Sequence, residues 1–592
     1  MQNILKFFTT RSLPLPLLAV LCWRLALPQF SFWLLVFIAP AIWTIIIRLP
    51  QLPGKHPYFA IWFASFLFWL SSIYWFAYPH PILILGLVAG AAYLSLYVPL
   101  FIALCRHAVF NRSVKPVFIV PIIWCGTEFI RKHLLGGFSL SSLEHALYKQ
   151  PYLIGIADIS GEYLVGMMIM LVGAALACVV PIDYPDSMKY PPRNGYIGRR
   201  VWKRNYSFEP LFLAAVAVTV TIVYSVIGAK NTNSYLQQHL NERRVCVLQG
   251  NTKIQLLMTE EMANDTSNQF VELARQAAME AALRPDLIVF PETVFAIPFV
   301  EYEDGFTLNS EAATNEEREY WRTLSETARE QVLRNNAELC NKEIIAAVKS
   351  IGVPTILGLS TARLVTRHGS NPLRLNSALL VDPESGLQSR YDKISLVMFG
   401  EYIPLSNLIP ENFPLRSLCP EAVAGNEYVA TPIPPLADSA MVKGKNRYAA
   451  INICFESTIP HFIRRQVVTL HNNGDEPMLL INISNDAWFP FTCEAEQHLA
   501  TMVFRAVEHR KPLVTASNGG YAAVIDANGN IVTQGKRNNA ESITQTCQLS
   551  EIHTFYTHWG DTLAWSSFFV LIMVTSSWIV EARRKRYNRS GE

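Results

Sequence analysis

The sequence predicts a polytopic α-helical membrane domain joined to a soluble α/β sandwich domain. Long apolar runs are confined to residues 1–228 and 563–580, and short apolar runs alternate with helical patterns in 241–560. Only 16% of the 592 residues are charged, against about 25% in soluble proteins. At about 150 residues per domain, this length fits more than one folding unit. We therefore expect an N-terminal membrane domain at 1–230, the soluble domain at 241–560, and a C-terminal helix with a basic tail at 561–592.

The apolar runs are long enough to be membrane spans. A helix that crosses a bilayer needs roughly 20 mostly apolar residues. Eight runs are candidate spans, and the first and fifth of them are short or interrupted. They lie at about 12–27, 29–48, 57–78, 82–105, 117–131, 161–181, 211–228 and 563–580. The first run lacks a small-residue cleavage site and another span follows at once, so no cleaved signal peptide is expected.

The loops between these spans differ in charge, and the difference sets the predicted topology. Lys and Arg accumulate in every second loop and in the C-terminal tail, whereas the loops around residue 28 and at 79–81 have none. Because cytoplasmic loops carry an excess of Lys and Arg, both termini are expected inside and residues 241–560 outside. The basic connection at 131–160 is the exception. The net charge of +3 gives no case for a nucleic-acid partner.

The soluble region alternates strands with helices. Apolar β-type runs lie at 244–248, 287–290, 355–359, 377–381, 449–453, 478–483 and 513–515. The segments 521–525 and 531–533 flank Asp526-Ala-Asn-Gly529 as a hairpin-like pair. Helical patterns lie at about 258–283, 312–350 and 495–510. This alternation favours an α/β sandwich over an all-α or all-β domain. The cysteines show no zinc-site or disulfide spacing.

Charged residues near the ends of two spans have structural explanations. Glu128 and Arg131 lie three residues apart near a helix end, which predicts an ion pair within one helix. Asp158 and Glu162 flank the next span and are expected to face water. We assign none of the four to the chemistry of the protein.

Three side chains in the soluble domain suit acyl transfer through a thioester. Cys454 ends the run from Tyr448, Glu292 ends the run from Asp286, and Lys393 lies between them in the sequence. Each has an ordinary explanation alone: a buried strand-end thiol, a turn carboxylate and a surface ammonium. Together, Glu292 would take the thiol proton, Cys454 would attack a carbonyl, and Lys393 would stabilise the oxyanion. We expect Glu292 and Lys393 both to favour the ionised form of Cys454.

Longer strings around these residues resemble the apolipoprotein N-acyltransferase branch of the nitrilase superfamily. In the soluble domain they are Gln249-Gly-Asn251, Pro291-Glu292-Thr293, Tyr391-Asp-Lys393, Phe399-Gly-Glu-Tyr-Ile-Pro404, Cys454-Phe-Glu456 and Ser484-Asn-Asp-Ala-Trp-Phe489. In the membrane domain they are Trp124-Cys-Gly-Thr-Glu-Phe-Ile-Arg131 and Gly136-Gly-Phe138. The resemblance covers nearly the whole chain, with seven spans before the soluble domain and one after it.

The resemblance implies a nitrilase-like αββα sandwich that uses the three residues named above. It implies that Glu401 and Glu456 support the site, and that Phe455 stands where the family usually has a tyrosine. Such enzymes move an acyl chain from a phospholipid to the α-amino group of the N-terminal diacylglyceryl-cysteine of apolipoproteins. They work in the bacterial inner membrane with the catalytic domain facing the periplasm. No cofactor, metal ion or nucleic acid is implied.

Two other functions stay open. A membrane-tethered amidase or nitrilase-type hydrolase would use the same three residues with water as the acyl acceptor, but it would not need eight spans. A transporter or scaffold with a domain that only binds would leave the three residues idle, and few charges lie in the spans to mark an ion path. The acceptor, a lipid amine or water, distinguishes the transferase from the hydrolase.

Overall fold

The computed structural model describes residues 11–182, 207–239, 241–253, 259–280, 284–303, 324–364, 372–403, 422–435 and 447–590. The chain forms two compact units. The helical unit comprises Met1–Asn233, Thr492–Arg510 and His553–Glu592, and the sheet unit comprises Ser234–Phe491 and Lys511–Ile552. Two pieces of the region expected as one soluble domain therefore pack within the helical unit.

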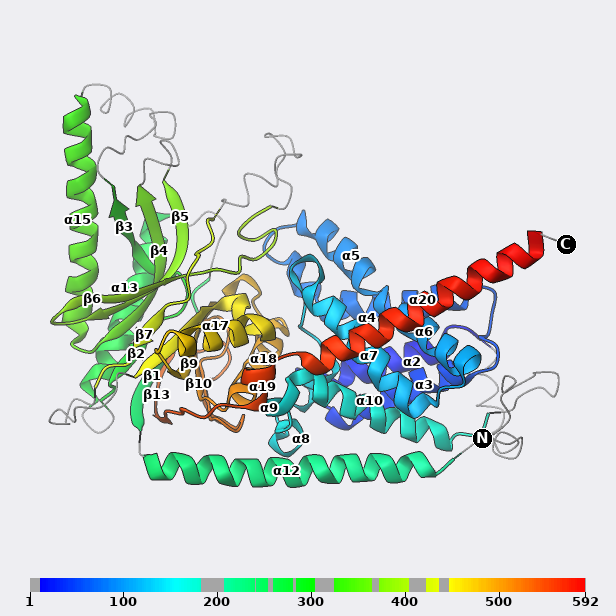
Figure 1. Ribbon diagram of the computed structural model, residues 1–592. Coiled ribbons are helices and arrows are strands. Elements are labelled where there is room, and N and C mark those ends of the chain that lie inside the picture. The colour runs from blue at the N-terminus through cyan, green and yellow to red at the C-terminus, as the bar shows by residue number, and fades with distance from the viewer. Residues whose placement is uncertain are drawn as a thin grey trace. The chain divides into compact units, whose positions relative to one another are not determined.

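The helical unit contains most of the helices of the chain (Figure 1). They are α2 (Pro14–Ala26), η1 (Trp33–Phe37), α3 (Ile38–Arg48), α4 (Pro57–Ser72), η2 (Tyr74–Ala77), α5 (Leu83–Leu94), α6 (Tyr97–Arg112), α7 (Pro116–His133), η3 (Leu134–Gly136), η4 (Leu143–Leu147), α8 (Pro151–Ile154), α9 (Ala157–Ser160), α10 (Glu162–Val179), α12 (Glu209–His239, which extends into the sheet unit), α18 (Glu494–His509), α19 (Phe555–Trp559) and α20 (Thr562–Ser590). Helices α2, α4 and α7 begin with proline, which the first helical position tolerates because its N–H needs no partner there.

Several of these helices have the length and composition of membrane spans. Among the described residues, four are long and apolar enough to cross a bilayer: Leu83–Arg112, Glu162–Val179, Glu209–His239 and Thr562–Asn588. Shorter apolar helices lie at Pro14–Ala26, Trp33–Arg48 and Pro57–Ser72. Helix α7 covers the fifth predicted span, but charged side chains occupy its C-terminal turns. The described residues therefore include four helices of membrane-spanning length and composition, and the membrane domain with eight spans stays a prediction.

Tryptophans from four helices form the aromatic centre of the helical unit. The ring of Trp23 in α2 lies 5.3 Å from that of Trp43 in α3 and 6.0 Å from that of Trp69 in α4. Trp43 also stacks on Trp124 of α7 at 5.1 Å. Such aromatic pairs contribute about 0.5–1.5 kcal/mol each beyond the burial of their area. This cluster fixes α2, α3, α4 and α7 against one another.

The sheet unit is built on a 13-stranded sheet with the central order β6-β5-β4-β2-β1-β10-β9-β8-β7. Its strands are β1 (Glu242–Gly250), β2 (Leu287–Val289), β3 (Phe295–Tyr302), β4 (Thr355–Leu364), β5 (Leu373–Asp382), β6 (Gly386–Asp392), β7 (Ala430–Pro432), β8 (Tyr448–Ile453), β9 (Pro477–Asn485), β10 (Leu513–Asn518), β11 (Ala523–Ile525), β12 (Ile531–Gln534) and β13 (Glu541–Gln548). Its helices are α13 (Glu260–Met279), α15 (Glu326–Ile351), η9 (Cys454–Thr458), α17 (Pro460–Asn472) and η10 (Asp486–Trp488). From β4 to β8 the central strands run parallel.

The sheet folds into a sandwich with one core between its two halves. Val245 and Val247 of β1 share this core with Ile451 of β8 and side chains of β9 and β10. On the other face of β1, Cys246 and Leu248 pack with residues of α13 and α15. Helix α17 packs against β8 and β9. The predicted α/β sandwich is therefore confirmed, and strands buried on both faces explain the continuous apolar runs.

Sequence patterns located most of the central strands and missed several others, of which β6 and β13 are mostly polar. The predicted hairpin exists, since β11 and β12 pair antiparallel. Strands β3, β6, β7 and β13 and helix α17 were not predicted. Strand β13 pairs with β1 over eight positions although its residues are mostly polar. Part of the predicted helix at 312–350 lies outside the described residues, and the described part is α15.

Candidate active site

Glu292 stands in a tight turn that follows β2. Gly358 on β4 allows this turn to approach the sheet, because a Cβ at position 358 would lie 2.0 Å from the carbonyl oxygen of Pro291. The next residue, Thr293, has a positive φ of 49°. The turn directs Glu292 inward, where only 5% of the residue is exposed.

Three donors face the carboxylate of Glu292. Its Oε1 accepts hydrogen bonds from Asn376 Nδ2 at 2.6 Å and from Lys393 Nζ at 3.1 Å. Its Oε2 accepts the backbone N–H of Asn485 at 3.0 Å. Because a carboxylate oxygen can accept two hydrogen bonds, Oε2 is the atom with room for a further proton.

Lys393 follows β6 and is buried between two carboxylates. Its Nζ lies 3.1 Å from Glu292 Oε1 and 2.9 Å from Glu401 Oε1. Burial opposes its positive charge, but Glu292, Glu401 and the sulfur of Cys454 hold the pKa of Lys393 well above its ordinary value. The ammonium therefore stays charged and lies between the two carboxylates.

Cys454 adopts a left-handed backbone conformation where β8 ends and η9 begins. Its φ is 54°, which costs a non-glycine residue about 1–3 kcal/mol. Two side chains bind its carbonyl oxygen, Asn482 through Nδ2 at 3.2 Å and Ser457 through its hydroxyl at 3.1 Å. This left-handed conformation is thus held in place by hydrogen bonds from β9 and η9 to the carbonyl of Cys454.

The environment of Cys454 favours the neutral thiol in the resting site. Burial raises its pKa well above the ordinary value, and the negative charge of Glu292 raises it further. Lys393 lowers the pKa but does not outweigh these two effects. The expectation that Glu292 favours the ionised thiol was therefore wrong, because a carboxylate repels a neighbouring thiolate. The charge of Lys393 acts in the expected direction.

Glu456 connects the loop that carries Lys393 to the turn that carries Cys454. Its Oε1 accepts the backbone N–H groups of Ile394 and Ser395 at 2.8 and 2.9 Å. Its Oε2 accepts the N–H of Ile453 at 2.8 Å. Burial raises the pKa of Glu456 to about 7, against the lowering effect of these backbone donors. The fully buried carboxylate of Glu456 therefore binds the backbone next to Lys393 and next to Cys454 at the same time.

The other two predicted supporting residues lie in the same region. Glu401 accepts from Lys393 as described, and its Oε2 accepts the N–H of Val397 at 2.8 Å. Phe455 is partly exposed directly after the nucleophile candidate, and its carbonyl accepts the hydroxyl of Thr458 at 2.8 Å. All six predicted site residues therefore lie on loops or in the short helix η9 within the sheet unit.

Two asparagines that hold the site were missed from the sequence. Asn376 Nδ2 donates to Glu292 and also to Glu401 Oε1 at 3.2 Å, so it bridges the two carboxylates. Asn482 positions the carbonyl of Cys454 from within β9. Both amides interrupt apolar strand sequences, and a polar residue buried in such a run needs a hydrogen-bond partner. An asparagine within an apolar run was therefore the sequence feature that could have identified these two residues.

The fold and the site define a class of protein: an α/β-sandwich enzyme with a buried carboxylate, ammonium and thiol, in a chain with membrane-length helices. Comparison with protein families identifies it further. The carbon-nitrogen hydrolase family matches residues 244–556, and the apolipoprotein N-acyltransferase N-terminal domain matches residues 19–175. The chain belongs to the carbon-nitrogen hydrolase family, in its apolipoprotein N-acyltransferase branch, and is an acyltransferase.

Individual relatives agree with this placement. The apolipoprotein N-acyltransferase of Geobacter metallireducens is 28% identical over 510 residues, which cover 85% of this chain and 82% of the relative. That of Rhodopirellula baltica is 25% identical and covers 96% of this chain and 97% of the relative. A solved amidase from Nesterenkonia sp. is 12% identical, with a TM-score of 0.32 over 51% of this chain and 89% of that one.

Proposed function

We propose that this enzyme transfers an acyl chain from a phospholipid, through a thioester on Cys454, to the α-amino group of the N-terminal diacylglyceryl-cysteine of apolipoproteins. The names of the relatives supply the substrate class. The observation that carries the proposal is that Lys393 Nζ lies 3.1 Å from Glu292 Oε1, while the carboxylate of Glu456 binds the backbone next to both Lys393 and Cys454.

In the first half-reaction Glu292 Oε2 is the proton acceptor. It takes the thiol proton as the sulfur of Cys454 forms a bond to the ester carbonyl carbon, so that the nucleophile is generated only during attack. The ammonium of Lys393 stabilises the negative charge that develops on the carbonyl oxygen. When the carbon–oxygen bond breaks, Glu292 returns the proton to the departing lysophospholipid, and the acyl group remains on sulfur.

The second half-reaction reverses these roles around an amine. The α-amine of the acceptor cysteine attacks the thioester carbonyl and passes a proton to Glu292. The carbon–sulfur bond then breaks, an amide is formed, and the sulfur of Cys454 recovers the proton from Glu292. Each residue thus ends the cycle as it began, and no cofactor is consumed.

We place the enzyme in the inner membrane of a bacterium. Eight spans with both termini in the cytoplasm would put residues 241–560 in the periplasm, in agreement with the distribution of Lys and Arg in the loops. Both substrates are lipids, so a catalytic domain carried by spans before and after it meets them at the bilayer surface.

Intact-mass analysis tests the proposal. The purified enzyme is exposed to phospholipid alone, and we expect one acyl-chain mass on Cys454 in a hydroxylamine-sensitive bond. The adduct should persist for minutes and should disappear when a peptide with an N-terminal diacylglyceryl-cysteine is added, as a third, amide-linked chain appears on the peptide. Cys454→Ala is the control and should acquire no adduct.

The same measurement separates the transferase from a hydrolase. Rapid release of free fatty acid without the lipopeptide, or a discharge rate that ignores its amine, would contradict the transferase proposal. A stable adduct on Cys454→Ala would show that the acylated residue is another one.

A further inference from the structure

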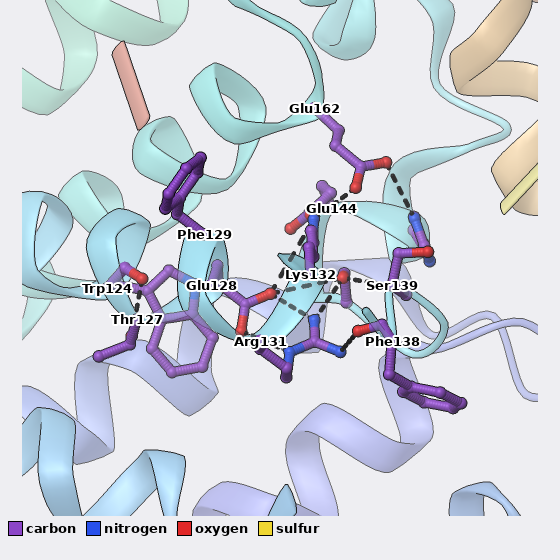
Figure 2. A network of polar contacts seen from close by, with 12 residues as sticks. Trp124, Thr127, Glu128, Phe129, Arg131, Lys132, Phe138, Ser139, Glu144 and Glu162 are labelled. Carbon is purple, nitrogen blue, oxygen red and sulfur yellow. Dashed lines mark hydrogen bonds and ion pairs between the residues drawn. The ribbon is translucent and has the colours of Figure 1, made fainter. Parts of the chain in front are cut away.

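Buried polar clusters lie in each unit, beyond the residues described so far. In the helical unit, Figure 2 shows Lys132 bound to Glu162 and Arg131 bound to Glu128. The Arg131–Glu128 contact, 2.9 Å from Nε to Oε1, confirms the ion pair predicted from their spacing. Contrary to the expectation from the sequence, neither Asp158 nor Glu162 faces water, since they are 7% and 0% exposed. These groups have partners of opposite charge where they are buried, so their role is structural.

The cluster in the sheet unit consists of two serines that bind one aspartate. Ser484, near the end of β9, donates its hydroxyl to Asp486 Oδ1 at 2.5 Å, and Ser517 of β10 donates to Asp486 Oδ2 at 2.8 Å. All three residues are buried. The backbone of Gly520 approaches so closely that a Cβ there would collide with Asp486 Oδ2 and with the hydroxyl of Ser517. The carboxylate is therefore held through both of its oxygens.

Strand pairing places Ser484 beside the nucleophile candidate. Ile453 of β8 pairs with Ile483 of β9, and Cys454 and Ser484 directly follow these two residues. Ile483 faces the core between the two halves of the sheet, so Asn482 and Ser484 point to the opposite face of β9. Asn482 binds the carbonyl of Cys454 at 3.2 Å, and the hydroxyl of Ser484 forms a hydrogen bond with the sulfur.

Ser484 and Asp486 act on the charge of this sulfur in opposite directions. Burial and then Glu292 are the largest causes that raise the pKa of Cys454, as described above. The negative charge of Asp486 raises this pKa further, whereas the hydrogen bond from Ser484 lowers it, as does the charge of Lys393. Two residues in direct contact with each other therefore have effects of opposite sign on the thiol.

The hydroxyl of Ser484 has one proton and two groups that can accept it. A hydroxyl is a single donor with two acceptor lone pairs. While Cys454 is a neutral thiol, its sulfur is only a weak acceptor, and the proton of Ser484 stays with Asp486. Once the sulfur is charged, it becomes a strong acceptor, because hydrogen bonds to ionised groups are roughly twice as strong as neutral ones. Asp486 then still accepts from Ser517.

We propose that Ser484 is a catalytic residue whose hydroxyl turns from Asp486 to the sulfur of Cys454 whenever that sulfur carries negative charge. This occurs twice in the proposed cycle, as the sulfur attacks the ester and again as it leaves the thioester carbonyl carbon. Ser484 keeps its own proton throughout, and Glu292 remains the group that accepts and returns protons. The inference rests on the proposed function, since it assigns the charged sulfur to acyl transfer.

The test compares Ser484→Ala with Ser517→Ala in the full chain, reconstituted in phosphatidylethanolamine–phosphatidylglycerol nanodiscs. Ser484→Ala should slow acylation of Cys454 at saturating phospholipid by about tenfold, the lower end for a lost hydrogen bond to a charged group. Ser517→Ala is the matched control, because it removes an equally buried hydroxyl from the same carboxylate, one strand further from Cys454. It should slow acylation by less than about threefold.

Alkylation by iodoacetamide, followed by peptide mapping, measures the charge of the sulfur without any acyl donor, because the thiolate is the form that reacts. At a fixed pH, Ser484→Ala should lower the alkylation rate of Cys454 by about tenfold. Asp486→Asn should raise this rate, because it removes a negative charge and frees the hydroxyl of Ser484. A general loosening of the site would move both rates in the same direction.

The outcomes separate this inference from the proposed function. Equal slowing by the two serine variants, or an unchanged alkylation rate in Ser484→Ala, would overturn the role of Ser484. If Ser484→Ala does not fold, Asp486→Asn decides alone, and a rate that fails to rise would count against the inference. If no lipid adduct forms on the wild type but the alkylation rates change as expected, the hydrogen bond to the charged sulfur stands and only the proposed function fails.

Discussion

Replacement of Lys393 by methionine should reveal two separate contributions of its charge. Methionine is similar in length and uncharged, so it keeps most of the packing but loses the contacts to Glu292 at 3.1 Å and Glu401 at 2.9 Å. The buried carboxylate of Glu292 and the partly buried carboxylate of Glu401 are then left without a cation between them. Removal of one partner from a buried pair costs about 3–5 kcal/mol of stability. Loss of the oxyanion donor should slow acylation of Cys454 by about 10²–10³-fold.

Thermal unfolding and the initial rate of acylation, measured on the same sample, are the assays. Lys342→Met is the matched control, because Lys342 pairs with Glu338 at 3.3 Å while their side chains are 74% and 59% exposed. Such exposed pairs contribute only about 0–1 kcal/mol. The double variant Lys393→Met/Glu401→Gln removes one of the uncompensated carboxylates, so it should regain stability without regaining the rate.

The pH dependence of the stabilising contribution of Lys393 follows from the direction of its pKa shift. The folded chain holds the pKa of Lys393 above its ordinary value of 10.5, so its stabilising contribution is complete below that value and is lost only at higher pH. The stability difference between wild type and Lys393→Met should therefore stay constant from about pH 6 to 9. A rate no lower than that of Lys342→Met, or recovery of the rate in the double variant, would refute the oxyanion role.

Three further predictions follow from other parts of the chain. Asn376→Leu removes the amide that bridges the two carboxylates, so it should lower the unfolding free energy by about 1–3 kcal/mol and slow acylation, as calorimetry and adduct formation would show. Reporter fusions at Asn233 and Glu592 should report opposite sides of the membrane, and the same side would contradict the eight-span count. Burial raises the pKa of Glu508 from 4.5 to about 8, so stability should fall as pH rises between these values; thermal unfolding of Glu508→Gln should lack this slope.

The sequence was sufficient to predict features that depend on residues close together in the chain. The run from Tyr448 predicts a buried strand and places Cys454 at its end, and strand ends are where α/β folds carry their sites. The pair Glu128–Arg131 was also predictable, because residues three positions apart are neighbours on the surface of a helix. In each case the neighbours that decide the structure are close in the sequence.

Partners that are distant in the sequence explain the failures. Glu162 looked like a residue at the edge of a span, but its partners Lys132 and Arg505 are 30 and 343 positions away. Arg505 and Glu508 lie on a helix that was predicted correctly at 495–510, yet nothing in its pattern shows that this helix is buried on nearly all sides. The burial of such charges depends on which helices pack together, and that is decided by the whole fold.

In its resting state, the neutral thiol of Cys454 is protected from side reactions. A neutral thiol is a poor target for oxidants and stray electrophiles, since the thiolate is the reactive form. The carboxylate that raises its pKa is also the proposed base, and its oxygens accept hydrogen bonds from Asn376, Lys393 and the backbone N–H of Asn485. In the proposed mechanism, the sulfur would therefore become nucleophilic only as a carbonyl carbon receives its electron pair beside Lys393. The same requirement applies to the second step, in which an amine must reach Glu292 before it can attack. Control of the proton at Glu292, more than intrinsic reactivity of the thiol, would then decide which molecules this enzyme acylates.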